Sequence, residues 1–188
     1  MSYVTAESRV EWLPHGRAFS RADLDAMPDD GNRYEIIDGA LIVTPSPSMH
    51  HQAAVVALVA RLAPLCPTHL RVLVAPFDIE LAPNTVVQPD LLIAAKSQLT
   101  ERDLKGPPLL AVEVLSPSTR HLDLAFKRAR YEAAGCQSYW VVDPLQPSIV
   151  CWELKEGTYC DVGRAVGSGV ITLTRPFPFS ITPADLQD

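Results

Sequence analysis

The sequence lacks several features that would assign the chain to a specialised class of protein. No apolar run approaches the length of about 18 residues that a membrane-spanning helix needs. The four cysteines form no C-x-x-C pair, and the first residues lack the basic-then-apolar pattern of a secretion signal. These absences favour reduced cysteines over a disulfide framework or a zinc site. We therefore expect a cytoplasmic protein with no membrane partner.

An excess of positive charge is also lacking, because the formal net charge is −6. Proteins that coat nucleic acid normally present a basic surface, so this class is disfavoured, although a local basic cleft stays open. The chain has 188 residues, of which 47% are hydrophobic, and no internal repeat is visible. We expect a single soluble domain over residues 1–188, with residues 1–18 as an N-terminal arm.

The most informative pattern is an apolar run with a carboxylate inside it. Leu109–Leu115 is rich in branched side chains and is bounded by prolines on both sides, which predicts a strand buried on both faces. Glu113 lies in the middle of this run. An ionised carboxylate there costs several kcal/mol, as an order of magnitude, unless a cation, a metal or hydrogen bonds compensate it.

A helix and a second strand are predicted directly after this run. The helix should extend from about Arg120 to Ala134 and end at Gly135, and residues 138–142 form another buried-looking strand. Strand, helix and strand in this order predict a right-handed crossover with two parallel strands. Lys127 and Tyr131 are four residues apart and should lie on the flank of the sheet-facing side. The positions expected to face the sheet are Leu122, Ala125, Phe126, Ala129 and Ala133.

The rest of the chain reads as short elements separated by prolines and glycines. The predicted elements are a capping box that opens a short helix at 20–23, a hairpin over 34–43 that turns at Asp38-Gly39, a helix over about 49–65, strands at 70–74, 77–81 and 86–94 (broken by Pro89), a polar loop or short helix at 98–106, a hairpin over 148–162, a last strand at 171–173 and a terminal helical turn at 182–185.

Asp90 provides a second carboxylate at an apolar strand, because it follows Pro89 and precedes Leu91-Leu92-Ile93. Carboxylates are hard oxygen ligands that suit Mg²⁺ or Mn²⁺. Such an ion polarises a phosphodiester and lowers the pKa of a bound water. A lysine beside the two carboxylates, here Lys127, could hold the attacking water or neutralise charge that grows on the phosphate.

The chain also resembles a known family, the Uma2-like (DUF820) branch of the PD-(D/E)xK nuclease superfamily. The resemblance implies an α/β fold with a restriction-endonuclease-like core, in which helices flank a mixed central β-sheet and β-hairpins are added. It is carried by Tyr34-Glu35-Ile36-Ile37-Asp38-Gly39, Pro45-Ser46-Pro47 with His51, Val87-Gln88-Pro89-Asp90, Glu113-Val114-Leu115-Ser116-Pro117-Ser118-Thr119, Ala134-Gly135, Tyr139-Trp140-Val141-Val142-Asp143-Pro144 and Pro176-Phe177-Pro178.

The resemblance assigns roles to particular residues. It implies that Asp90 and Glu113 bind the metal ion, with the backbone carbonyl of Val114 as a third ligand. Glu35 resembles the additional acidic residue that some members bring to the metal. Leu115 stands where the motif lysine of the superfamily normally stands, and Lys127 on the following helix fits that role.

Three residues are weaker candidates for contact with the substrate, namely His51, Arg120 and Tyr131. Adjacent helical residues point about 100° apart, so His50 and His51 are not expected to share one metal ion. A basic group near the start of the predicted helix could line a rim that faces DNA, or could simply be a solvated helix face. That group is Arg120, His121, Lys127, Arg128 and Arg130.

Plainer interpretations remain open for each site residue. Glu113 could form a structural ion pair with a buried arginine or with Lys127. Asp90 could be only a turn residue, and both Lys127 and Glu35 could point to solvent.

Two functions from different classes follow. The first is a divalent-metal-dependent endonuclease that acts on phosphodiester bonds, most directly those of DNA, and that works as a homodimer. The second is a catalytically silent module that keeps the nuclease fold and binds nucleic acid or a protein. The leucine at position 115 and the acidic net charge favour the second.

Overall fold

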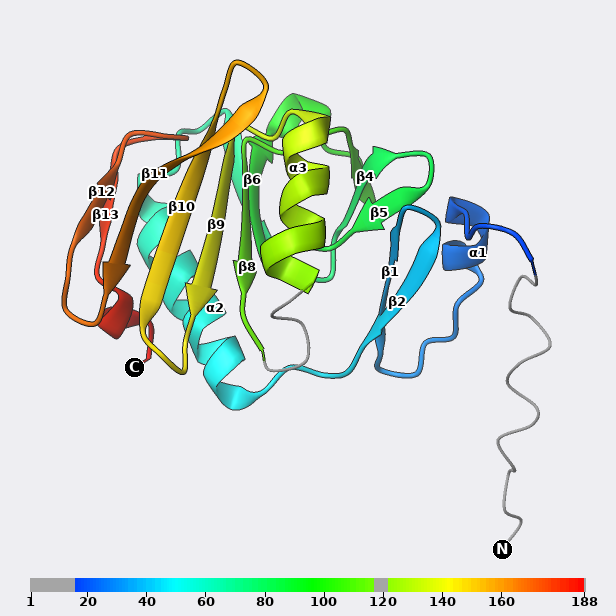
Figure 1. Cartoon of the computed structure of the whole chain (residues 1–188), viewed down its shortest axis with the longest axis horizontal. Coiled ribbons are helices and arrows are strands. Elements are labelled where there is room, and N and C mark those ends of the chain that lie inside the picture. Colours follow the sequence, from blue (N-terminus) through cyan, green and yellow to red (C-terminus); the bar gives the residue numbers. More distant parts are fainter. Residues whose placement is uncertain (1–15, 117–121, 188) are drawn as a thin grey trace, which may run out of the picture.

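The computed structural model describes residues 16–116 and 122–187 (Figure 1). Along the chain the main elements are α1 (Arg21–Asp25), β1 (Arg33–Ile37), β2 (Ala40–Thr44), α2 (Met49–Leu62), β3 (Leu70–Val74), β4 (Asp78–Ala82), β5 (Thr85–Val87), β6 (Leu91–Ala95), β7 (Asp103–Lys105), β8 (Leu110–Val114), a π-helical turn (Leu122–Lys127) that leads into α3 (Arg128–Ala134), β9 (Ser138–Asp143), β10 (Ser148–Lys155), β11 (Thr158–Val166), β12 (Ile171–Leu173) and β13 (Phe179–Ile181). Short 3₁₀ turns at Ala63–Leu65, Lys96–Gln98 and Pro183–Leu186 complete the set.

The strands form two larger sheets and one small ribbon. The six-stranded sheet has the order β11-β10-β9-β8-β6-β3, the five-stranded sheet has the order β2-β1-β5-β4-β7, and β12 pairs with β13. In the six-stranded sheet β8 and β9 are parallel, with Glu113 opposite Val141, while the other neighbours are antiparallel. The predicted crossover from β8 through α3 to β9 is therefore confirmed.

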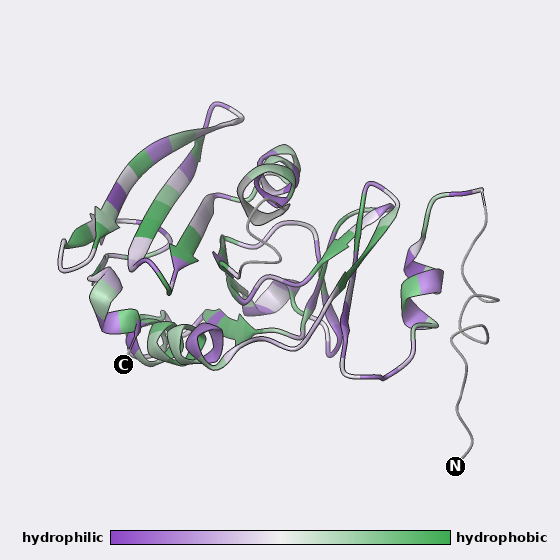
Figure 2. Ribbon diagram, turned by 60° about the horizontal axis from the view of Figure 1, so that its bottom comes forward, coloured by the Kyte–Doolittle hydropathy of each residue, from purple (hydrophilic) through white to green (hydrophobic). Residues whose placement is uncertain are grey.

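Two helices lie on opposite faces of the six-stranded sheet (Figures 1 and 2). Because side chains alternate along a strand, β8 contributes to both faces. Leu110 and Val112 pack in the core on the α2 side, and Ala111 and Leu115 pack in the core on the α3 side. Glu113 follows the same alternation as Ala111 and Leu115, so its carboxylate lies beneath α3.

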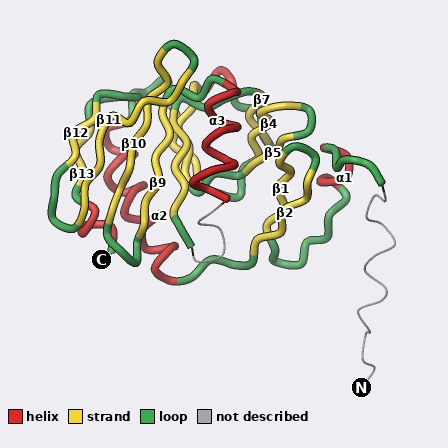
Figure 3. The backbone as a smooth tube through the Cα atoms, in the orientation of Figure 1, coloured by secondary structure: helices red, strands yellow, loops and turns green. Residues whose placement is uncertain are grey.

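The hairpin of β1 and β2 starts the five-stranded sheet and turns as the sequence predicts. Asp38 and Gly39 have φ of 52° and 78°, the left-handed conformation that an Asp-Gly hairpin turn requires. A Cβ on Gly39 would lie 2.5 Å from the Cβ of Ala18, so this position also needs the missing side chain. The two groups of strands lie on either side of α3 in the view of Figure 3, and Ile37 and Ile79 share the core beneath that helix.

The rotation of the crossover helix differs from the predicted one. Of the five positions expected to face the sheet, Ala125, Phe126, Ala129 and Ala133 are exposed, and the side chain of Leu122 lies outside the described part. Lys127 and Tyr131 are instead fully buried. The apolar spacing was therefore the wrong guide. Polar and aromatic contacts determine the buried face, since Lys127 pairs with carboxylates below it and the Tyr131 ring lies 5.2 Å from that of Tyr139. The predicted helix end is confirmed, because Gly135 has φ of 88° and closes α3.

Two short strands were not predicted. Residues 98–106, interpreted as a loop or short helix, include β7, which pairs in parallel with β4. Residues 179–181 form β13 against β12. Each has three residues, which is too short for a periodic signal. That residues 1–188 form one domain with an arm at 1–18 stays a prediction, because residues 1–15 lie outside the described part. None of the described helices has the length and apolar character needed to cross a membrane.

Candidate active site

A buried lysine lies between two buried glutamates where the two larger sheets meet α3. The Lys127 Nζ is 2.9 Å from Glu35 Oε1 and 3.3 Å from both carboxylate oxygens of Glu113. All three residues are 0% exposed. The structure therefore excludes the interpretations in which Lys127 or Glu35 points to solvent. The ion pair between Glu113 and Lys127, which the sequence left open as an alternative, is present.

Further donors hold the two glutamates in place. The backbone N–H of Gln88, in the segment that joins β5 to β6, donates to Glu35 Oε1 at 2.7 Å. The Tyr131 hydroxyl donates to Glu113 Oε1 at 3.4 Å from one turn beyond Lys127 on α3. Burial is the main cause that raises the pKa of Tyr131, with a smaller contribution from the charge of Glu113. The tyrosine thus stays protonated and serves as a donor.

Asp90 is the third buried carboxylate, and it lies directly before β6. Its Oδ2 accepts a hydrogen bond from the backbone N–H of Val114 at 2.7 Å and lies 3.1 Å from His51 Nε2. Its Oδ1 accepts from Arg33 Nη1 at 2.9 Å. Burial raises the pKa of Asp90, but the hydrogen bond and charge of His51, with the charges of Arg33 and Lys127, outweigh burial and hold the pKa at about 2. The carboxylate is therefore ionised at neutral pH.

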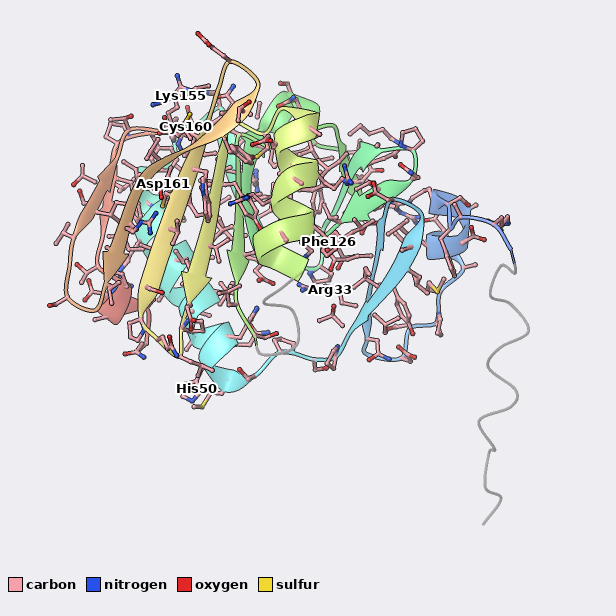
Figure 4. All side chains as sticks on the ribbon, in the orientation of Figure 1. Arg33, His50, Phe126, Lys155, Cys160 and Asp161 are labelled. Atoms are coloured by element: carbon pink, nitrogen blue, oxygen red, sulfur yellow. The ribbon has the colours of Figure 1, made fainter. Side chains whose placement is uncertain are left out.

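Arg33 is a site residue that sequence reasoning missed. It is the first residue of β1 and is labelled in Figure 4. Besides its contact with Asp90, its Nε lies 3.8 Å from Glu35 Oε2. Burial lowers the pKa of Arg33, but the neighbouring carboxylates of Glu35, Asp90 and Glu113 raise the pKa by more than burial lowers it. The side chain therefore stays charged. No local pattern marks Arg33, because it is 57 residues away from Asp90 in sequence.

A pocket of about 740 Å³ opens beside Asp90. Its lining includes Asp90, Arg33, His51 and Gln88, together with residues of α1, of the segment before α2 and of the segment between β3 and β4. Glu35, Glu113 and Lys127 are fully buried and are not part of this lining. A ligand that enters the pocket therefore meets Asp90, Arg33 and His51 first.

The weaker candidates have different outcomes. His51 and Tyr131 lie beside Asp90 and Glu113, respectively. His51 is held on the first turn of α2, where its backbone N–H donates to the Ser48 side chain that caps the helix. Arg120 lies outside the described residues.

The expected basic rim is occupied by contacts within the chain, as far as it is described. His121 also lies outside the described residues. The guanidinium of Arg128 lies 5.2 Å from the centre of the Trp152 ring, and Arg130 pairs with Asp38 at 2.6 Å. These two arginines are therefore held by neighbours of their own rather than presented as a free basic edge.

The donor chemistry of the site fits a divalent cation. Three carboxylates supply hard oxygen ligands, and the buried Glu35 Oε2 has no hydrogen-bond donor among the described residues. Asp90 and Glu113, with Glu35 beside them, are the groups that would hold the ion. Within residues 16–116 and 122–187, no three acidic, histidine or cysteine side chains already converge in the geometry of a metal site.

Comparisons with known proteins bear on the family and the fold of the chain. Residues 21–186 match the model of the Uma2 family, which is described as "putative restriction endonuclease". A crystal structure from Anabaena variabilis, described as a "putative nuclease belonging to DUF820", superposes with a TM-score of 0.67 at 16% sequence identity. The match covers 89% of this chain and 97% of that one, and it confirms the predicted α/β nuclease-like fold. No curated protein matches the sequence.

Proposed function

The chain belongs to the Uma2 family, and from that premise we propose that it is a divalent-metal-dependent endonuclease that hydrolyses phosphodiester bonds, with DNA as the substrate. One observation carries the proposal. Glu35, Asp90, Glu113 and Lys127 are far apart in sequence and lie on separate elements, yet they form one buried polar cluster beside a pocket. Burying three carboxylates is unfavourable for stability alone, which favours a functional reason for the cluster.

In this proposal Asp90 and Glu113 hold Mg²⁺ or Mn²⁺, with the Val114 carbonyl as a third ligand and Glu35 in support. When bound, the ion would polarise the phosphodiester and lower the pKa of the attacking water molecule, which makes that water a better nucleophile. Lys127 keeps its ammonium at 2.9 Å from Glu35 and 3.3 Å from Glu113, where it offsets their negative charge.

Cleavage of supercoiled plasmid DNA with Mg²⁺ or Mn²⁺ tests the proposal. Wild type is compared with Asp90→Asn and Lys127→Met, and each variant is first shown to be folded by circular dichroism. We expect cleavage by the wild type, losses of about 100-fold or more in both variants, and no cleavage in EDTA. Equal cleavage by all three proteins would mean that a contaminant is responsible and would remove the proposal.

A silent module is the second candidate, and a specific observation favours it. Each of the three carboxylates already contacts a basic side chain, so none of them lacks a basic partner when no metal ion is bound. Calorimetric titration with Mn²⁺ separates the two candidates. The endonuclease should bind Mn²⁺ in a way that Asp90→Asn abolishes, whereas the silent module should bind none through Asp90.

Two further parts of the proposal concern the state of the protein in the cell. We propose a homodimer, because two copies of a small nuclease can reach both strands of a duplex, and analytical ultracentrifugation tests it. We also propose a reducing, cytoplasmic location, which is supported by the free thiols of Cys66, Cys136, Cys151 and Cys160.

A further inference from the structure

We propose that Arg33 is a displaceable cation, which occupies the place of the metal ion at Asp90 in the free protein and binds the phosphate of the substrate once the ion enters. This inference rests on the proposed function, since it describes how the same site takes up metal and substrate together. It assigns a phosphate-binding role to a residue that the family resemblance does not mark.

The contacts of Arg33 place it where a metal ligand would have to become free. Its Nη1 lies 2.9 Å from Asp90 Oδ1, and its Nε lies 3.8 Å from Glu35 Oε2. It therefore bridges two of the three carboxylates, in the way that a bound cation would. A divalent ion at Asp90 would need the oxygen that the guanidinium now holds.

The charges of the cluster also favour displacement. Three carboxylates, Glu35, Asp90 and Glu113, contact the two permanent cations Arg33 and Lys127. A divalent ion added to this set would place four positive charges against three negative ones in a buried space. An excess buried charge is strongly unfavourable, so one of the two side chains should leave.

Exposure decides which of the two cations leaves. The Lys127 side chain is 0% exposed and is enclosed beneath α3. The Arg33 side chain is 19% exposed and lines the pocket, so its guanidinium can move into that space.

The composition of the pocket indicates what the displaced guanidinium would bind. Among the described residues of the lining, Arg33 is the only lysine or arginine, whereas four residues are acidic, namely Asp25, Asp29, Asp78 and Asp90. Asp25 and Asp78 are already paired with Arg21, which is not part of the lining, so a phosphodiester in this pocket would meet no other arginine or lysine of the described lining. Arginine binds phosphate through two parallel hydrogen bonds, which makes it the natural contact for a phosphate group here.

Metal ion and phosphodiester should therefore assist each other in binding. A phosphate that holds Arg33 in the pocket frees Asp90 for the ion, and an ion at Asp90 frees Arg33 for the phosphate. Because binding linkage is reciprocal, each ligand should raise the affinity of the other by the same factor, which we expect to be about tenfold or more.

Mn²⁺ titration of wild type and Arg33→Met, with and without a short DNA oligonucleotide, tests the proposal. Methionine keeps an unbranched apolar side chain without the charge. Arg33→Met should bind Mn²⁺ about tenfold more tightly than wild type when no oligonucleotide is present. The oligonucleotide, whose integrity is checked after each titration, should tighten Mn²⁺ binding to wild type but not to Arg33→Met. An oligonucleotide with uncharged methylphosphonate linkages should have no such effect on either protein.

Thermal unfolding provides a second readout if Arg33→Met is less stable. In EDTA the variant should unfold at a lower temperature than wild type, because Asp90 loses a partner, and Mn²⁺ should raise its unfolding temperature more than that of wild type. Arg21→Met is the matched control. Arg21 pairs with Asp78 in the same pocket wall at 2.8 Å but touches none of the three carboxylates, so metal binding should be unchanged.

The outcomes separate this inference from the proposed function. Equal or weaker Mn²⁺ binding by Arg33→Met, or an oligonucleotide effect that persists in that variant, would overturn the role of Arg33. If the wild type still binds Mn²⁺ and cleaves DNA, the proposed endonuclease function is retained. No Mn²⁺ binding by any of the proteins would overturn both.

Discussion

The buried carboxylate of Asp90 gives the protein a pH dependence of stability that can be worked out from its contacts. Its pKa is held at about 2, below the ordinary value of 3.8, by His51, Arg33 and Lys127. At about 1.4 kcal/mol for each pKa unit, this difference corresponds to about 2 kcal/mol of folding free energy. Because the pKa is lower in the folded state, the contribution is complete above the unfolded value near 3.8. It is lost as the pH falls toward about 2.

Urea unfolding of wild type and Asp90→Asn in EDTA measures this contribution. The three tryptophans of the chain allow the transition to be followed by fluorescence. The asparagine cannot ionise, so the difference in unfolding free energy between the two proteins should shrink by about 2 kcal/mol between about pH 6 and pH 2. An exposed carboxylate serves as the control. Asp25, which pairs with Arg21 at the surface, should contribute less than about 1 kcal/mol at any pH when changed to asparagine.

A difference between wild type and Asp90→Asn that stays constant over this range would contradict the lowered pKa of Asp90. It would mean that the Asp90 carboxylate does not hold its charge through Arg33 and His51 in the folded protein. The electrostatic basis of the site would then have to be sought elsewhere.

Three other substitutions test the supports of the cluster. Lys127→Met should lower the unfolding free energy by about 3–5 kcal/mol, because Glu35 and Glu113 lose their shared cation, and a loss below about 1 kcal/mol in urea unfolding would contradict the buried contacts. Tyr131→Phe should cost about 1 kcal/mol by the same measurement, since only its hydroxyl contact with Glu113 is removed, and an unchanged midpoint would show that this contact is unimportant. Ser48→Ala removes the cap of α2 and should cost about 1 kcal/mol, whereas Ser48→Asp, which can still cap, should retain the stability of wild type.

The sequence marks Glu113 and Asp90 well because each stands out among its apolar neighbours, whereas Glu35 was indicated only by the family resemblance. A glutamate inside a run such as Leu109–Leu115 is conspicuous, and Asp90 stands between a proline and an apolar strand. The Asp38-Gly39 turn and the Gly135 helix end are equally local signals, and both occur where they were expected. Local chemistry of this kind depends only on residues that are adjacent in the chain.

The partners of these carboxylates could not be predicted in the same way. Arg33 reaches Asp90 only because β1 pairs with β5 and the two sheets meet beside α3. No spacing in the sequence encodes this contact. The predicted rotation of the crossover helix was wrong for a related reason. A helix that covers buried carboxylates turns a lysine rather than an alanine toward them.

The position of the lysine connects these two observations. Glu113 and Leu115 are two residues apart and point to the same face of the sheet, so a lysine at position 115 would lie next to the glutamate. Here that position is occupied by leucine, and the π-helical turn that leads into α3 brings Lys127 Nζ within 3.3 Å of Glu113. In this chain the ammonium group therefore lies beside the carboxylate on one face of the strand, and the helical segment above the strand supplies it. Lys127 is fully buried because a helical segment can present an amine to a strand only through the surface by which the two are packed.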